Sequence, residues 1–418
     1  MRILWHMPTL RHNTCGLSNR AVQLAGQLQR HGHEIEFVVD ANKTDSTEDE
    51  IGSMGLRRLI LEPPRPLHWS LQASAKRRSA ASIVSMIGLD HDLFISCQPE
   101  VVATYADVER RKPLVFVCGG TTLLHDVAGA TVTRHSGPRR LAFGLDRYLK
   151  HCNESNAFSA ADVVIFDSAA TRSLVLKRYG MDGRRCHVVY GGVDPKEFQP
   201  ASDTCRESAR RMLGVEQSEW VVVWSGRLSP EKNVELLISS LPLMRRPPDR
   251  VMLVGDGPLR HALAERARAE GVENIVRFVG RQSDIRPFLH AADVFAFPSR
   301  CESFGGSLVE AMACGLPCIA LRPDGESVRN ASAEILEHGE TGLLADRPEP
   351  SAFAKVLDRV AEDVPMCRQL GASGRRRVLD GFTWSAGGSK MHDLLSAIGP
   401  RPQGRGRREK KLESVGAR

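Results

Sequence analysis

The chain has 418 residues, more than one ordinary hydrophobic core holds, so we expect two domains of roughly 200 residues each. Its composition, 42% hydrophobic and 26% charged, excludes a mostly disordered or fibrous protein. Residues 399–418 supply +5 of the net charge of +7, through five Arg and two Lys against two Glu. We therefore expect a nearly neutral folded body and no nucleic-acid partner. The basic tail is expected to be solvated, with membrane contact through it as the alternative.

The first forty residues predict a βαβ unit. Arg2–Trp5 is an apolar run of strand type, and a polar loop over 12–16 follows it. Apolar residues then recur at helical spacing up to Gly32, and Ile35–Val39 resumes an apolar run. A strand, a glycine-containing loop, a helix and a second strand in this order imply a parallel sheet.

The next strand-type runs complete one Rossmann-like domain, predicted over residues 1–198. They are Leu93–Ser96, Leu114–Cys118, Val163–Phe166 and His187–Tyr190. Pro195 and Pro200 then introduce a polar, charged stretch, and we place a linker over residues 199–219.

A second alternation of strands and helices begins at Trp220 and predicts a second Rossmann-like domain over residues 220–382. Its strand-type runs are 220–226, Val251–Val254, Ile275–Val279, Val294–Phe297, Cys318–Leu321 and Gly342–Ala345. A last helix over 383–398 and a disordered tail over 399–418 follow. The fold class is therefore α/β, with two doubly wound domains facing a central cleft.

Cysteine usage and the N-terminal sequence indicate a reduced, cytoplasmic protein. No Cys-x-x-Cys pair occurs, and Cys314 and Cys318 bracket a Gly-Leu-Pro turn without neighbouring His residues. We expect these two as buried side chains and no bound metal. The first residues are too poor in apolar side chains for a signal peptide, and no run approaches ~18 apolar residues.

The loop after the first strand of the second domain carries two cations. Gly226 ends the strand, Arg227 and Lys232 flank a turn, and a helix is predicted to start near Glu231. Ligands of open α/β sheets bind at the carboxyl ends of the strands. Two cations at this place favour a diphosphate, although such loops also carry Arg and Lys for solubility.

A glycine-containing loop follows the strand Val294–Phe297. Gly305 and Gly306 leave backbone N–H groups bare at the start of a helix, which is typical of a phosphate site. Glu310 lies about one turn into this helix, where its carboxylate can accept from a ribose diol. Glu302 precedes the glycines, on the side where a sugar beyond the phosphates would project.

These residues resemble the family-four retaining glycosyltransferases of GT-B fold (glycosyl transferases group 1), which include sucrose synthase-like and lipopolysaccharide core transferases. The family's E-x7-E signature corresponds to Glu302 and Glu310, and its phosphate loop corresponds to Gly226, Arg227 and Lys232. Further motifs in family order are Val254–Pro258, Phe278–Gly280, Ala291–Val294, Pro298-Ser299, Gly339–Leu343 and Phe382–Trp384. The match is dense over 190–384 and thin before it.

The resemblance implies a donor site in the C-terminal domain, an acceptor side in the N-terminal domain, and a crossover helix over 383–398 that returns to the N-terminal domain. Arg227 and Lys232 are expected to neutralise the diphosphate leaving group in catalysis. Glu302 is expected to act in catalysis at the sugar. The other donor-binding residues implied are Gly16, Gly226, Arg281, Ser303, Phe304, Gly305, Gly306, Ser307, Leu308 and Glu310, with the backbone of 303–308 at the phosphates, Glu310 at the ribose and Arg281 near the base.

Three positions depart from the family pattern. Many members have a histidine after the strand Leu114–Cys118, where this chain has Gly119 and Gly120. We expect His125 to fold back over these glycines and act in catalysis, with a surface position as the alternative. One glycine, Gly16, stands where a pair is common, and Ala331–Glu334 matches the family's Gly-Gly-x-Pro-Glu element only in part.

We therefore predict a metal-independent glycosyltransferase that needs no cofactor. It would move a hexose-type sugar from a nucleoside diphosphate, UDP before GDP or ADP, to a hydroxyl acceptor with retention, while the leaving diphosphate helps to take the acceptor's proton. The acceptor is expected to be a small molecule, a glycan or a lipid-linked sugar. The alternatives are an epimerase or phosphorylase of the same fold and a non-catalytic sugar-nucleotide-binding partner. A dehydrogenase is disfavoured because Gly-x-Gly-x-x-Gly is missing from the first βα turn.

Overall fold

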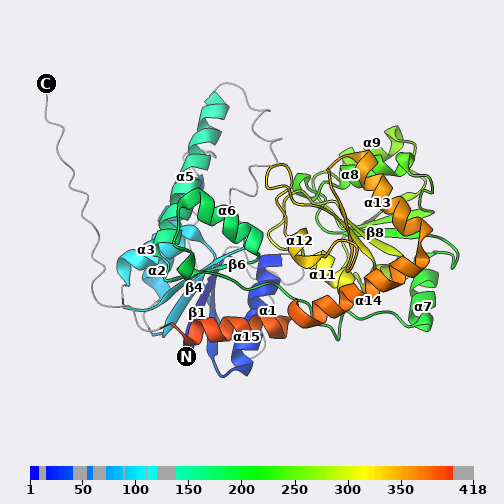
Figure 1. Ribbon diagram of the computed structural model, residues 1–418. Coiled ribbons are helices and arrows are strands. Elements are labelled where there is room, and N and C mark those ends of the chain that lie inside the picture. The colour runs from blue at the N-terminus through cyan, green and yellow to red at the C-terminus, as the bar shows by residue number, and fades with distance from the viewer. Residues whose placement is uncertain are drawn as a thin grey trace.

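Two parallel β-sheets, each flanked by helices, form the molecule, as Figure 1 shows. The computed structural model describes residues 1–8, 16–40, 54–59, 72–87, 90–109, 111–119 and 138–398. The predicted α/β fold with two Rossmann-like domains is confirmed. The predictions on Gly120, His125 and the basic tail fall on residues outside these ranges.

The N-terminal sheet has seven parallel strands in the order β3-β2-β1-β4-β5-β6-β7. Most of these strands are apolar runs buried on both faces, as expected where helices cover both sides of a parallel sheet. The strands are β1 (Arg2–Met7), β2 (Glu34–Asp40), β3 (Gly55–Leu59), β4 (Leu93–Ser96), β5 (Leu114–Cys118), β6 (Val163–Phe166) and β7 (Cys186–Val188). The helices are α1 (Gly16–Arg30), α2 (Gln72–Ile87), α3 (Pro99–Val108), α5 (Pro138–Ala160) and α6 (Ala169–Tyr179).

The C-terminal sheet has six parallel strands in the order β10-β9-β8-β11-β12-β13. The strands are β8 (Val221–Ser225), β9 (Arg250–Val254), β10 (Val276–Gly280), β11 (Val294–Phe297), β12 (Cys318–Leu321) and β13 (Leu343–Ala345). The helices that belong to it are α7 (Asp203–Leu213), α8 (Val234–Ser240), α9 (Arg260–Ala269), α10 (Arg286–Ala291), α11 (Gly306–Ala313), α12 (Ser332–Ile335), α13 (Pro350–Glu362) and α14 (Val364–Gly381). The last helix, α15 (Trp384–Ser396), returns to the N-terminal domain. Single 3-10 turns lie at Gly183–Arg185, Pro230–Lys232 and Leu241–Leu243.

The predicted strand runs agree with the observed strands to within two residues. The largest differences are at β1, which ends at Met7 rather than at Trp5, and at β7, which ends at Val188 rather than at Tyr190. β3 has no counterpart in the prediction, because Arg57 interrupts its apolar pattern. The Arg57 guanidinium lies 2.8 Å from a carboxylate oxygen of Glu36 on β2, so an ion pair replaces an apolar contact at this sheet edge.

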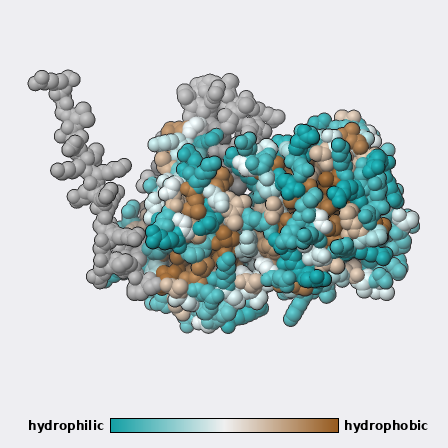
Figure 2. All heavy atoms as spheres, in the orientation of Figure 1, coloured by the Kyte–Doolittle hydropathy of each residue, from teal (hydrophilic) through white to brown (hydrophobic). Residues whose placement is uncertain are grey.

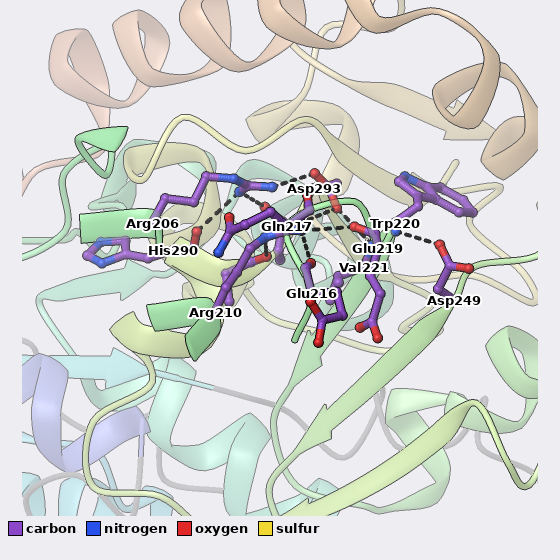
Figure 3. A network of polar contacts seen from close by, with 12 residues as sticks. Arg206, Arg210, Glu216, Gln217, Glu219, Trp220, Val221, Asp249, His290 and Asp293 are labelled. Atoms are coloured by element: carbon purple, nitrogen blue, oxygen red, sulfur yellow. Dashed lines mark hydrogen bonds and ion pairs between the residues drawn. The ribbon is translucent and has the colours of Figure 1, made fainter. Parts of the chain in front are cut away.

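The stretch 199–219 contains α7, which packs on the C-terminal domain through Arg210. This side chain is 1% exposed and donates to the Asp293 carboxylate at 2.8 Å (Figure 3). It also donates to four backbone carbonyls, those of Glu216, Gln217, Glu219 and Ala291. One guanidinium thus donates hydrogen bonds to the carbonyls of the loop that leads into β8. These acceptors and the Asp293 carboxylate offset the cost of burying its charge.

The chain crosses between the domains twice, and the two crossings run side by side. Val193 N–H donates to the Phe382 carbonyl at 3.1 Å, and Trp384 N–H donates to the Val193 carbonyl at 3.3 Å. The backbones approach so closely that a Cβ on Gly192 would lie 2.4 Å from the carbonyl carbon of Thr383. We call this paired crossing, residues 190–193 and 382–384, the hinge.

After the hinge, α15 packs against α1 of the N-terminal domain, as the red and blue helices in Figure 1 show. Met391 and Leu395 join the apolar core beneath α1. Gly388 is required at this contact, because a Cβ there would lie 2.2 Å from the Gln27 Cβ. The C-terminal helix therefore completes the N-terminal domain.

The surface of the described residues carries both hydrophilic and hydrophobic side chains. Hydrophilic side chains cover most of the C-terminal domain on the face shown in Figure 2. None of the helices in the described ranges is both long enough and apolar enough to cross a bilayer.

The hinge yields a stability prediction. Gly192→Ala should lower the free energy of unfolding by about 1–3 kcal/mol, because its Cβ would overlap the Thr383 backbone and one crossing must shift. Urea denaturation followed by circular dichroism measures this change.

Gly26→Ala in α1 is the matched control, since a Cβ at Gly26 meets nothing within 4 Å. Alanine in a helix interior is favoured by about 0.5–1 kcal/mol, so this variant should be as stable as wild type or more stable. Equal stability of both variants would contradict the close packing of the hinge.

Candidate functional site

The candidate site lies where the strand order of the C-terminal sheet reverses, beside the central strands β8 and β11. Ligands of open α/β sheets bind outside the carboxyl ends of the strands at this point. The loop after β8 carries Arg227 and Lys232, and the loop after β11 carries Glu302. The two loops touch, because Arg300 N–H donates to the Glu231 carbonyl at 2.9 Å. The structure therefore brings the two predicted loops together.

Lys232 and Glu302 form an ion pair through Nζ and Oε2. Their side chains are 20% and 17% exposed. Arg227 is exposed, and its guanidinium has no carboxylate partner among the described residues. An anion that enters this place therefore meets one free guanidinium and one ammonium that is shared with a carboxylate.

The turn that carries Lys232 differs from the predicted helix start near Glu231. Pro230–Lys232 is a single 3-10 turn, and α8 begins at Val234. Asn233 separates the two with a φ of 52°, in the left-handed region that ends helices. Its Nδ2 donates to the Pro298 carbonyl at 3.1 Å, so the turn is tied to the end of β11.

Glycines let the loops after β8 and β9 pack backbone against backbone. A Cβ on Gly255 would lie 1.8 Å from the Gly226 carbonyl oxygen, and a Cβ on Gly257 would lie 2.4 Å from the Leu228 carbonyl oxygen. No side chain fits at either position. The motif Val254–Pro258 is thus a support beneath the loop that holds Arg227.

The helix α11 begins at the glycine pair. Gly305 is its N-cap residue and has a φ of +118°, which a side chain rarely adopts. The first N–H groups of a helix have no acceptor within the helix, and the helix dipole adds positive potential there. Because Gly306 is exposed, these N–H groups can be approached by an anion such as a phosphate.

Glu310 lies one turn into α11 and is half-buried. Burial, with a smaller contribution from the Glu197 carboxylate, raises the pKa of Glu310 to about 7. No hydrogen-bond donor among the described residues contacts its carboxylate. The two glutamates of the signature therefore differ: Glu302 is held by a lysine, whereas Glu310 is available to hydroxyl donors.

Phe304 and Leu308 point into the core and not toward a ligand. Phe304 is 8% exposed and its ring packs against those of Tyr190 and Phe382, with centroids 6.1 and 6.0 Å apart. Leu308 is fully buried. Among the predicted donor-binding residues, these two can contribute only backbone groups.

The remaining predicted residues lie at the carboxyl ends of other strands. Arg281 is exposed and follows β10, two strands from β8. Gly16 is the first residue of α1, in the N-terminal domain. Gly119 follows β5, and a Cβ there would lie 2.5 Å from Leu17 Cδ1. A side chain at this position, where many family members have a histidine, would therefore require Leu17 to shift.

The cysteines Cys314 and Cys318 are buried, as predicted. Burial raises the pKa of the Cys314 thiol to about 12, and the Cys318 thiol donates to the Leu316 carbonyl at 3.3 Å. Within the described ranges, no three His, Cys, Asp or Glu side chains are grouped as metal ligands.

Two carboxylates at the domain boundary were missed by the sequence analysis as functional residues. Asp167 accepts a hydrogen bond from Ser303 Oγ at 3.2 Å, and Glu334 accepts from backbone N–H groups at the start of α6. Asp167 directly follows the predicted strand Val163–Phe166. The rule that ligands of open α/β sheets bind at the carboxyl ends of the strands could therefore have identified it. Nothing local to Glu334 indicates a partner in the other domain.

Two family models match the chain and together cover most of it. The model described as "Glycosyltransferase Family 4" matches residues 14–197, and the model described as "Glycosyl transferases group 1" matches residues 206–377. The boundary between them coincides with the segment that leads from the hinge into α7.

Curated relatives include a "GDP-mannose-dependent alpha-(1-6)-phosphatidylinositol monomannoside mannosyltransferase" of Mycolicibacterium smegmatis, 34% identical over 56% of this chain and 62% of that protein. A "D-inositol 3-phosphate glycosyltransferase" of Corynebacterium glutamicum is 34% identical over 58% of this chain and 59% of its own length. The chain therefore spans about three fifths of each of these relatives.

Solved structures share the architecture over nearly the whole chain. HepE of Anabaena, solved with UDP and glucose, is 21% identical with a TM-score of 0.70 and covers 95% of this chain and 99% of its own. Sucrose-phosphate synthase from Thermosynechococcus elongatus is 22% identical with a TM-score of 0.74 and covers 94% and 98%. At these identities the likeness shows the fold. The chain belongs to the group 1 glycosyltransferases and has their GT-B fold.

Proposed function

We propose that the chain is an enzyme that transfers a hexose from a nucleoside diphosphate to a hydroxyl acceptor. The observation that carries this proposal is the convergence of three features at the carboxyl ends of β8 and β11. Arg227 and Lys232 supply positive charge, the glycine-capped start of α11 supplies N–H donors, and Glu310 supplies a carboxylate. These groups match the phosphates and the ribose of a sugar nucleotide.

For the nucleotide, we propose GDP rather than the UDP that the sequence analysis expects. The 34% identical mannosyltransferase is named as GDP-mannose-dependent. The HepE structure with UDP shares 21% identity and supports only the fold. A GDP-linked hexose of the mannose type is therefore the donor of this proposal.

For the acceptor, we propose a hydroxyl group of a compound that contains inositol. The names of the two relatives mention inositol 3-phosphate and a phosphatidylinositol mannoside, which share an inositol ring. In this proposal the N-terminal domain contributes the acceptor side, because the groups proposed for the diphosphate and the ribose follow strands of the C-terminal sheet.

The proposed chemistry depends on stabilising the leaving diphosphate. Arg227 and Lys232 would bind the charge that develops as the sugar leaves, without a metal ion in this role. The departing phosphate oxygen would accept the acceptor's proton on the same face of the sugar, so the product keeps the donor's configuration. Glu302, which now pairs with Lys232, would share this lysine with the diphosphate.

The direct test is transfer with defined substrates. Incubation with GDP-mannose should release GDP faster with inositol 3-phosphate or phosphatidylinositol vesicles than without an acceptor. Coupled detection of GDP measures the rate, and NMR of the product should show an α linkage.

Other outcomes separate the alternatives. A sugar changed without any acceptor would indicate an epimerase, and nucleotide binding without turnover would indicate a non-catalytic partner. Transfer from UDP-hexoses alone would contradict the GDP assignment, and a β product would contradict retention.

The cation prediction concerns Arg227. Arg227→Ala should weaken binding of GDP by about 1.5–3 kcal/mol, because a charge-assisted contact to phosphate is lost while the fold is unaffected. Isothermal calorimetry measures the affinity. Arg266→Ala on α9, which removes an exposed ion pair with Glu235, is the control and should bind GDP like wild type. An unchanged affinity of Arg227→Ala would remove it from the donor site.

The pH prediction concerns Glu310. Since its pKa is about 7 in the folded protein and about 4.5 in the unfolded chain, Glu310 is protonated at pH 6 and charged at pH 8. A charged carboxylate accepts hydroxyl hydrogen bonds more strongly, so GDP should bind about 5- to 10-fold more tightly at pH 8 than at pH 6. Glu310→Gln should reduce this difference in calorimetry to the part that comes from ionisation of the GDP phosphate itself.

The same shift has a consequence for stability. The native carboxyl binds its proton more tightly than the unfolded chain does, so the free energy of unfolding should fall as pH rises from about 4.5 to about 7. Glu310→Gln should be less sensitive to pH in this window. A variant with the wild-type pH dependence of both affinity and stability would contradict the raised pKa.

A further inference from the structure

Two segments of the C-terminal domain, the loop after β11 and the helix α12, contact one turn of the N-terminal domain. This β6–α6 turn comprises residues 167–170, between the end of β6 and the first turn of α6. Ser303 contacts it at Asp167, and Glu334 contacts it at Ala169 and Ala170. The two attachments come from different elements of the C-terminal domain, which meet at the same turn.

The first attachment is centred on a buried ion pair. Asp167 Oδ1 pairs with the Arg20 guanidinium from α1, and both side chains are 7% exposed. Arg20 is itself fixed, because its Nη2 donates to the Val189 carbonyl at 2.7 Å. The other carboxylate oxygen, Oδ2, accepts from Ser303 Oγ at 3.2 Å. The Asp167 carboxylate, which Arg20 fixes in the N-terminal domain, thus holds Ser303 of the C-terminal domain. We call the loop that carries Ser303, residues 298–305, the donor loop.

The second attachment is a carboxylate at the start of a helix. Glu334 Oε2 accepts from Ala169 N–H at 2.8 Å, and Oε1 accepts from Ala170 N–H at 2.6 Å. Tyr190 of the hinge donates its hydroxyl to Oε2 at 3.0 Å. The N-terminus of the 11-residue helix α6 favours a negative group, so the charge of Glu334 strengthens the contact.

Both attachments belong to the framework of the candidate site. Ser303 directly follows Glu302, the partner of Lys232. The segment before Glu334 is bonded to the same loop, since Glu302 N–H donates to the Arg329 carbonyl at 3.2 Å and Asn330 Nδ2 donates to the Ser299 carbonyl at 2.7 Å. A displacement of either contact therefore moves the loop that carries Glu302.

We propose that Asp167 and Glu334 are positioning residues that hold the donor loop against the β6–α6 turn. They would thereby fix the position of the N-terminal domain relative to the bound donor. This inference rests on the proposed function, because the relative position of the domains matters for activity only if a sugar is transferred from one domain to an acceptor on the other. The groups proposed for the phosphates and the ribose, Arg227, Lys232, the start of α11 and Glu310, lie in the C-terminal domain, so losing the turn contact changes domain placement and transfer more than nucleotide affinity.

Two variants remove the attachments one at a time. Glu334→Ala removes the helix cap. Arg20→Leu/Asp167→Leu removes the acceptor of Ser303 and replaces the buried ion pair by apolar side chains together, which avoids leaving one charge buried alone. Glu337→Ala is the matched control, because Glu337 is exposed, lies in the same segment as Glu334, and pairs with Arg377 inside the C-terminal domain.

Three measurements test the proposal on the full chain. Small-angle scattering should show a larger radius of gyration for each attachment variant than for wild type. Calorimetry with GDP should give affinities within about twofold of wild type. The kcat/KM for transfer should fall about tenfold in each variant, which corresponds to about 1.4 kcal/mol, and more than a hundredfold when both attachments are removed, because either one alone keeps part of the contact.

The outcomes distinguish the two proposals. Wild-type scattering and wild-type kcat/KM in both variants would overturn the positioning role, even if their melting temperatures fell. If wild-type protein transfers no sugar from any donor, the proposed function fails, whereas the scattering comparison still decides whether these contacts set the domain placement. If Glu337→Ala changed the radius of gyration and kcat/KM as much as Glu334→Ala does, the effect would come from disturbing the segment in general. That result would overturn the role assigned to Glu334.

Discussion

The paired crossing of the chain at Val193 and Thr383 is the constraint on which the arrangement of the molecule depends. Two backbone hydrogen bonds join the crossings, and Gly192 lies too close to Thr383 for a side chain. Because both connections between the domains pass through this one place, the carboxyl ends of the two sheets are held near each other. The aromatic side chains of Tyr190 and Phe382 pack on Phe304, so the hinge also fixes the loop that follows β11.

The site combines rigid backbone with a small number of unpaired or weakly paired charges. Glycines such as Gly255 let neighbouring loops pack without side chains between them, which leaves little freedom for the loop of Arg227. On this rigid support, the Arg227 guanidinium has no carboxylate partner in the described part of the chain. The Lys232 ammonium is shared with Glu302, and Glu310 has a pKa near neutrality. Such a balance suits a ligand that brings both negative charge and hydroxyl groups.

Most of the architecture was predictable because buried parallel strands are short apolar runs with glycine or charged residues at their ends. The runs that became β8 and β11 marked the site, since loops at adjacent carboxyl ends must meet. The edge strand β3 and the helix α7 were not predictable in this way. Arg57 and Arg210 occupy positions that look solvated in the sequence, yet each is satisfied by partners distant in the chain. The contact of Glu334 with α6 was hidden for the same reason, because 164 residues separate the partners.

The packing of α15 on α1 has a consequence for the order of folding during synthesis. Met391 and Leu395 contribute to the core of the N-terminal domain, yet the whole C-terminal sheet lies between them and β7 in the sequence. At a translation rate of about 5–20 residues per second, the ~200 residues from β7 to α15 take roughly 10–40 s to synthesise, and the part of α1 that α15 covers stays exposed throughout. During this interval the nascent N-terminal domain exposes the apolar side chains that Met391 and Leu395 later contact, so its core is completed only after the second domain has been synthesised.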